Sequence, residues 1–500
     1  MKFFKQIVKN PIVWLIVLSC VYLFSRFLNI TNLPIFTDEA IYIRWAQIGG
    51  RDASWRFISL TDGKQPLFTW GMMIFLRFFK DPLFAGRFTS VISGLTGMIG
   101  MYALAHELFR SKKIGIISSF LYIISPFALF YDRLAIYDSL VSAFYVWNLY
   151  LSVLLIRYMR LDIALIFGFV LGFGMLNKSS AFLSLYLVPC TLVLFDWKAK
   201  NIVLRMGKWI WYIAISALVS QVIYSVLRLS PYFYIIAQKD SIFVYPFSLW
   251  ITHPFKFFNG NMYGMIDWML GYMSWPIFIS AEIFPFFFKK NLQEKLVLLA
   301  MWVFPFIALG LFGRVLYPRY ILFMIMPLLI LSAYTISMIL TKMKNHFVGY
   351  SIVGLLCLIN IYSSYTIVFT IKSAYIPKAE RGQYIDGWPS GWGIPEIVTI
   401  LKDDMQNNKI SVYTEGTFGL LPYALEIFLG DFRNIDIHGI WPIPREMPED
   451  MRVSAKDHPT YFVMYQHQSP PFEWRLQLIQ EYQKGLSTES ASMRLYKVNP

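Results

Sequence analysis

The chain has 500 residues, of which 57% are hydrophobic and only 15% are charged, whereas soluble domains are close to half apolar and a quarter charged. This composition excludes an ordinary soluble protein, and the long continuous apolar runs exclude the short alternating strands of a β-barrel. The net charge is +15, but much of the basic excess lies in short loops between apolar runs, as membrane topology requires. No basic domain stands apart from these runs, so we expect no nucleic-acid partner.

Apolar runs predict about eleven membrane-spanning helices, the first of which is expected to be retained after a basic N-terminus. The predicted spans are 11–29, 83–108, 114–131, 138–157, 162–177, 180–196, 209–228, 266–288, 295–312, 320–340 and 347–371. Segment 67–79 is apolar but too short to cross, because a crossing takes roughly 20 residues. It is therefore predicted to be an interfacial helix.

Basic clusters in alternate loops follow the positive-inside rule when the N-terminus is cytoplasmic. We expect the protein to lie in the cell membrane. With the N-terminus in the cytoplasm, the first loop (30–82) and the C-terminal region lie outside. Residues 372–500 are much less apolar than residues 1–371, and they predict a small extracytoplasmic α/β domain after a transmembrane domain. The pattern predicts strands at 409–413, 434–438, 461–465 and 493–498, and helices at 420–429 and 474–482. The aromatic-rich stretch 230–264 is expected to be an interfacial loop, with a groove for a lipid chain as the alternative.

Ionisable side chains from distant parts of the chain gather on the predicted outer face. Adjacent carboxylates, Asp38 and Glu39, stand in the first outer loop, which also contains Lys64. Charge at a bilayer surface needs water, a partner or a function. Later turns add Asp132, Arg133, Asp138, Lys178, Arg314, Tyr317, Arg319 and Tyr320. Carboxylates beside cations and tyrosines suit a reaction that needs a base and releases an anion.

Each of these groups also has a purely structural interpretation. Asp38 and Glu39 can begin a helix, since acids favour helix N-termini, and the charged residues of 131–139 can form a local salt-bridged turn. The side chains of Lys64 and Lys178 can extend to lipid headgroups. Arg314 and Arg319 run against the positive-inside bias, which favours a functional role for them.

Ordered motifs over about residues 1–340 resemble one family of membrane enzymes. After the acidic pair come Gly63-Lys64-Gln65-Pro66-Leu67, Gly86-Arg87-Phe88, Ser125-Pro126-Phe127 before Asp132-Arg133 and Asp138, Gly174-Met175-Leu176-Asn177-Lys178, and Pro318-Arg319-Tyr320. This series resembles the type-C membrane glycosyltransferases, which include protein O-mannosyltransferases and lipid A aminoarabinose transferases. Gln65 departs from the proline common in that family, and no β-trefoil insertion is visible.

The resemblance implies inverting transfer of a sugar from a polyprenyl-phosphate carrier to a hydroxyl of a lipid, glycan or protein at the outer face. Asp38 would be the general base or the residue that orients the acceptor. Glu39 would support it or contact the sugar, and Asp138 would lie near the acceptor or the first loop. The donor phosphate would be held by Lys64, Arg319, Lys178 and Tyr317, with Asp132, Arg133, Arg314 and Tyr320 as secondary candidates.

No metal or cofactor is implied as obligatory, although paired acids can bind a divalent cation. A lipid-linked sugar transporter is the alternative function, because charged residues and broken helices within the membrane occur in transporters too.

Overall fold

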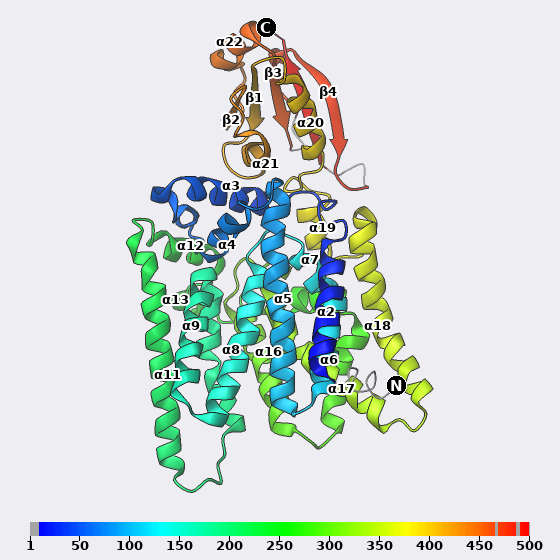
Figure 1. Ribbon diagram of the computed structural model, residues 1–500. Helices are drawn as coiled ribbons and strands as arrows, with labels where there is room; N and C mark the ends of the chain where they lie inside the picture. The colour runs from blue at the N-terminus through cyan, green and yellow to red at the C-terminus, as the bar shows by residue number, and fades with distance from the viewer. Residues whose placement is uncertain (1–9, 466–468, 487–490, 500) are drawn as a thin grey trace.

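The computed structural model describes residues 10–465, 469–486 and 491–499. A bundle of helices carries a small sheet-containing domain at one end (Figure 1). The helices of the bundle and its connecting segments are α2 (Pro11–Phe27), α3 (Thr37–Arg51), α4 (Leu67–Phe75), α5 (Pro82–Phe109), α6 (Lys112–Ile124), α7 (Pro126–Asp132), α8 (Asp138–Tyr158), α9 (Leu161–Asn177), α10 (Phe182–Tyr186), α11 (Ile202–Tyr224), α12 (Ile235–Phe243), α13 (Phe247–Thr252), α14 (Phe258–Met273), α15 (Trp275–Glu282), α16 (Leu292–Phe312), α17 (Ile325–Lys342), α18 (His346–Phe369) and α19 (Lys378–Tyr384).

The bundle confirms the predicted helical membrane fold. Within the described ranges, six helices are long and apolar enough to cross a membrane, or seven if the bent pair α6–α7 forms one span. Shorter apolar helices stand at Pro11–Phe27, Leu161–Asn177, Ser179–Leu194 and Trp275–Phe287, where further spans were expected. Segment 67–79, predicted to be interfacial, contains α4, whose nine residues are too few to cross a membrane.

One predicted span is divided in two. Instead of one helix over 266–288, α14 ends at Met273 and α15 begins at Trp275. Ser274 between them has a φ of +62°, outside the helical region. Pro276 stands in the first turn of α15, where its missing N–H removes no helical hydrogen bond, so a new helix begins after Ser274.

The C-terminal domain is a five-stranded sheet of order β2-β1-β3-β5-β4. Its elements are α20 (Ile394–Asp404), β1 (Ile410–Glu415), α21 (Leu420–Leu429), β2 (Ile435–Ile440), α22 (Glu449–Asp457), β3 (Thr460–Met464), β4 (Leu476–Gln483) and β5 (Ser492–Val498). β1 pairs in parallel with β2 and β3, whereas β5 runs antiparallel to β3 and β4. The four strands predicted from the sequence and the helix at 420–429 are confirmed.

The helix predicted over 474–482 is wrong, because this segment forms the edge strand β4. Glutamines and a glutamate, which are good helix formers, dominate its sequence. Its pairing with β5 outweighs that preference, a common result for strands whose stability comes from neighbours. The helices α20 and α22 were not expected.

The sheet domain is joined to the bundle through α3, which lies across the end of the bundle beneath α21 (Figure 1). Thr37 N donates to Pro389 O at 3.1 Å, and Gly391 N donates to Ile35 O at 2.8 Å. Farther along the helix, Arg44 Nε lies 2.6 Å from Glu426 Oε2. Contacts at the start and in the middle of α3 therefore fix this helix against the sheet domain.

Candidate active site

The two adjacent carboxylates at the start of α3 have different environments. Glu39 is fully buried and forms a bidentate pair with Arg87 of α5, with both N–O distances at 2.8 Å. Glu39 also accepts from Phe36 N at 2.9 Å, which caps α3, and from Ala135 N at 2.7 Å. Arg87 in turn donates to the carbonyls of Ile30, Leu33 and Pro34. Glu39 thus ties α3 to the bundle and does not line a cavity.

Asp38 instead lies near two cations, Arg319 and Lys64. Its Oδ2 lies 2.7 Å from Arg319 Nη1, and the two side chains are 22% and 12% exposed. Burial would raise the pKa of Asp38, but the charges of Arg319 and Lys64 and a hydrogen bond from Tyr42 outweigh it and hold the pKa below its usual 3.8. Asp38 is therefore ionised at neutral pH.

A cavity of about 390 Å³ lies beside this ion pair. Lys64, Asp138, Lys178, Arg319 and Tyr320 line its polar end. Apolar side chains form most of the rest of its wall, among them Val141, Leu183, Phe243, Val244, Leu309, Phe312, Leu316 and Phe323. The structure therefore brings together five of the residues selected from the sequence, and it joins them to an apolar chamber.

The cations at the polar end are held by carboxylates and aromatic rings. Lys178 Nζ lies 2.7 Å from Asp138 Oδ1 and 4.7 Å from the ring centroid of Tyr320. Lys64 Nζ lies 5.5 Å from the ring centroid of Phe243. Burial, reinforced by the nearby Arg319 and Lys178 charges, lowers the pKa of Lys64. An anionic ligand would relieve the repulsion among these three cations.

Tyr317 contributes to this cluster without lining the cavity. Its ring centroid lies 5.1 Å from the Arg319 guanidinium carbon. The Tyr317 and Tyr320 rings meet edge to face at 5.7 Å. Tyr317 therefore supports the orientation of Arg319, and direct contact with a ligand in the cavity would come from Tyr320.

Lys64 is positioned by the turn that precedes it. Gly63 ends a short 3-10 helix with a φ of +68°, a conformation that glycine adopts readily. A Cβ at this position would stand 2.7 Å from Lys239 Cβ, so the glycine also permits close approach of α12. An ion pair between Lys239 and Asp62 joins the turn to that helix.

Several lining residues were missed by sequence reasoning. Lys239, Asp240 and Phe243 of α12 line the main cavity, so the interfacial-loop interpretation of 230–264 is wrong for this helix. A smaller recess of about 30 Å³ adds Tyr42, Tyr137 and Asn177. The aromatic content of 230–264 was the available signal, because it also fitted the alternative of a groove for a lipid chain.

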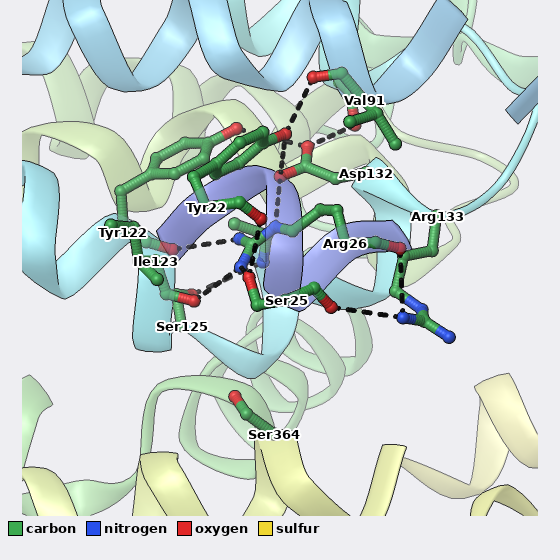
Figure 2. A network of polar contacts seen from close by, with 12 residues as sticks. Tyr22, Ser25, Arg26, Val91, Tyr122, Ile123, Ser125, Asp132, Arg133 and Ser364 are labelled. Carbon is green, nitrogen blue, oxygen red and sulfur yellow. Dashed lines mark hydrogen bonds and ion pairs between the residues drawn. The ribbon is translucent and has the colours of Figure 1, made fainter. Parts of the chain in front are cut away.

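Asp132 and Arg133 belong to a network of polar contacts (Figure 2), and neither residue lines the cavity. Asp132 accepts hydrogen bonds from Tyr22, Tyr122 and Ser139 and lies 3.3 Å from Arg26 Nε. Arg133 donates to main-chain carbonyls at the end of α2, those of residues 25, 26, 28 and 29. The local salt-bridged turn considered for 131–139 is therefore wrong: the acids of this turn pair with Arg26 and Lys178. Arg314 is exposed and does not line the cavity.

A buried acid behind the cluster was not expected from the sequence. Glu380 of α19 accepts hydrogen bonds from Tyr131 at 2.6 Å and Tyr272 at 3.0 Å. Its Oε1 and the hydroxyl of Tyr384 are both buried without a hydrogen-bond partner within the described part of the chain. Burial raises the pKa of Glu380 from 4.5 to about 7, more than the tyrosine hydrogen bonds and the Arg319 charge lower it.

Glu380 is expected to make the protein less stable as the pH rises. The pKa of Glu380 is about 7 in the folded protein, compared with its ordinary value of 4.5, which we take for the unfolded chain. Between pH 4.5 and 7, the folded state therefore binds a proton that the unfolded state has lost. The free energy of unfolding should fall by roughly 3 kcal/mol across that window. Thermal unfolding in detergent at about pH 5 and about pH 8 measures this fall in stability. The variant Glu380→Gln should abolish the difference in stability between the two pH values. Glu396→Gln, at an exposed site on α20, is the control; equal pH dependence in both variants would contradict the assignment.

Metal binding has no candidate site among the residues that the structure describes: no group of three or more histidine, cysteine, aspartate or glutamate side chains is arranged to hold an ion.

The fold is that of the type-C membrane glycosyltransferases, as comparison with known proteins shows. The profile of the family described as dolichyl-phosphate-mannose-protein mannosyltransferase matches residues 63–225. A search of curated proteins finds no match. The resemblance inferred from the sequence motifs is confirmed by the profile together with the solved structures that follow.

Two solved structures of ArnT from Cupriavidus metallidurans match almost the whole chain. The apo structure covers 97% of both chains with a TM-score of 0.59 at 14% identity. The structure bound to undecaprenyl phosphate covers 97% of this chain and 98% of that one, with a TM-score of 0.58 at 15% identity. The apo oligosaccharyltransferase of Archaeoglobus fulgidus covers 93% of this chain and 70% of that one, with a TM-score of 0.51 at 13% identity. At these identities the similarity establishes the fold.

Proposed function

We propose that the chain is a glycosyltransferase that moves a sugar from a polyprenyl-phosphate carrier to an acceptor hydroxyl at the outer membrane face. The observation that carries this proposal is the cavity of about 390 Å³, whose wall is mainly apolar and whose charged lining residues are the cations Lys64, Lys178, Lys239 and Arg319 and the acids Asp138 and Asp240. A polyprenyl phosphate has the matching form, an anionic head on a hydrocarbon chain. The fold relative bound to undecaprenyl phosphate supports the same carrier class.

In the proposed step, the acceptor oxygen forms a bond to the anomeric carbon while the bond from that carbon to the carrier phosphate breaks. The hydroxyl proton passes to the carboxylate of Asp38, and the polyprenyl phosphate leaves as an anion. Lys64, Lys178 and Arg319 stabilise the leaving phosphate electrostatically, so no general acid is required. Glu39 acts as a positioning residue, because its bonds to Arg87 and Phe36 fix the turn that carries Asp38.

The ion pair of Asp38 with Arg319 implies that the donor binds before Asp38 acts as a base. A phosphate and a carboxylate are alternative partners for one guanidinium. When the donor phosphate binds Arg319, Asp38 loses its strongest favourable charge partner, and its pKa rises toward a value better suited to a base. Donor binding thereby activates Asp38 before the acceptor reacts. Asp138 would hold Lys178 toward the phosphate through their 2.7 Å ion pair.

The test is incubation of the pure protein with polyprenyl-phosphate sugars and a panel of lipid, glycan and protein acceptors. Mass spectrometry would detect the glycosylated acceptor and free polyprenyl phosphate. Equimolar formation of both supports the proposal, whereas carrier binding without turnover against any acceptor would favour a transporter. Parallel reactions with a chelator test whether a divalent cation takes part.

The orientation is part of the proposal. Basic loops support a cytoplasmic N-terminus, with the first loop and residues 372–500 outside and residues 1–371 as the membrane domain. Labelling of a cysteine introduced at Arg433, an exposed position of the sheet domain, by a membrane-impermeant reagent in intact cells tests it. Labelling only after permeabilisation would reverse the orientation.

Removing a phosphate-binding cation is expected to weaken carrier binding. A charged hydrogen bond contributes about 1.5–3 kcal/mol, so Lys64→Ala and Arg319→Ala should each weaken polyprenyl-phosphate binding by about 10- to 100-fold. Titration with the unglycosylated carrier measures this directly. Lys256→Ala, at an exposed lysine that does not line the cavity, is the control. Unchanged affinity in both lining variants would mean that the phosphate binds elsewhere.

A further inference from the structure

A second cavity of about 860 Å³ lies at the junction of the bundle and the outer domain. The turn between α4 and α5 contributes Arg77, Phe79 and Lys80, and the outer domain contributes Lys402 of α20 and Phe428 of α21. None of its lining residues also lines the cavity of about 390 Å³ proposed to bind the sugar donor. We call it the junction groove.

The junction groove has a net positive charge, because the cations Arg51, Arg77, Lys80 and Lys402 line it together with only two acids, Asp81 and Asp431. Arg77, Lys80 and Lys402 have no ion-pair partner in the described ranges 10–465, 469–486 and 491–499. The acids that line the groove are both engaged: Asp81 caps α5 by accepting from the amides of residues 83 and 84, and Asp431 pairs with Arg51 at 2.5 Å. Three cations are thus available to one anionic ligand.

Apolar surface adjoins these cations at the level of the interfacial helix. Phe78, between Arg77 and Lys80, is 74% exposed, and Ile74 is 58% exposed. A further cavity of about 400 Å³ is lined by Arg56, Trp70, Met73, Ile74 and Arg77, and it shares Met73 and Arg77 with the junction groove. A cationic recess therefore continues into a mainly apolar one beside segment 67–79, which is predicted to lie at the membrane interface.

We propose that the junction groove binds an anionic phospholipid of the outer leaflet. The phosphate would lie among Arg77, Lys80 and Lys402, and the lipid chain would follow Met73 and Ile74 toward the bilayer. Charge complementarity selects the headgroup, and the adjoining apolar recess selects a lipid over a free anion. Because Lys402 belongs to the outer domain, the bound lipid joins that domain to the membrane. This inference does not depend on the proposed transferase activity, although the choice of leaflet rests on the proposed orientation.

Native mass spectrometry of the full chain, incubated with phosphatidylglycerol, phosphatidylcholine or inorganic phosphate, tests the site. We expect retained phosphatidylglycerol but no comparable retention of phosphatidylcholine. The triple variant R77A/K80A/K402A should retain at least about tenfold less, because each basic residue near an anionic headgroup contributes roughly fivefold. The control variant R433A/K456A/K497A removes the same charge from exposed positions outside the groove and should retain phosphatidylglycerol normally.

Three results would overturn the proposal. Equal losses in the two triple variants would mean that overall charge governs retention. Equal retention of phosphatidylcholine would mean that the groove does not select an anionic headgroup. Binding of inorganic phosphate without phosphatidylglycerol would identify a site for a free anion. If the triple variant proves unstable, K402E alters only the outer-domain cation and should still reduce retention.

Discussion

Asp38→Asn is expected to reduce sugar transfer by about three orders of magnitude, within the range that a positioned general base contributes. Asparagine keeps the size of the side chain but accepts no proton at neutral pH. Carrier binding should survive and even strengthen, because Arg319 would no longer be paired with a carboxylate at 2.7 Å. The measurement is single-turnover transfer at saturating donor, together with carrier titration.

Asp52→Asn is the matched control for this variant. Asp52 lies on the same outer loop and accepts from Ser54 N at 2.9 Å and from its hydroxyl at 2.7 Å, bonds that asparagine can also accept. The Asp52→Asn variant should transfer sugar at the same rate as the parent protein. Near-parent transfer by Asp38→Asn would remove Asp38 from the role of base, and loss of carrier binding in that variant would assign it to donor binding.

Glu39→Ala is expected to cost about 3–5 kcal/mol of stability, because it leaves Arg87 buried and without its counter-charge. Both side chains are fully buried, and the carboxylate accepts hydrogen bonds from Arg87 and from two backbone amides. Denaturant unfolding in detergent measures the loss. An exposed pair provides the comparison: Arg160 and Asp162 are 65% and 55% exposed, so Asp162→Ala should cost less than about 1 kcal/mol.

The pair itself can be separated from the charge that it leaves behind. Replacing Glu39 and Arg87 together by leucine removes both buried charges, and this double variant should recover part of the loss seen in Glu39→Ala. No difference between Glu39→Ala and Asp162→Ala would contradict the structural role given to Glu39.

The sequence predicted the membrane fold well because its signals are local. Apolar runs mark helices wherever they fold, and a spacing such as Gly63-Lys64 defines a turn within a few residues. The motif order also selected Lys64, Asp138, Lys178 and Arg319, which line one cavity. The edge strand β4 was missed because its stability depends on β5, whereas its own residues favour a helix.

The sequence could not assign partners across long distances. Adjacent residues on a helix point about 100° apart, so Asp38 and Glu39 had to face different surroundings, but nothing local indicated which carboxylate met the cations. The pairing of Asp132 with Arg26 spans 106 positions. Glu380 is a single acid in a short polar segment, and only the fold brings Tyr131 and Tyr272 to it.

The attachment of α3 limits how such enzymes can be recombined. The helix that carries Asp38 bonds to Pro389 and Gly391 at its start and to Glu426 along its length. A chimera that exchanged residues 372–500 for those of a relative would therefore alter the setting of Asp38, the carboxylate proposed as the base. An exchange of this domain that preserves the position of Asp38 must keep these junction contacts or change both sides together.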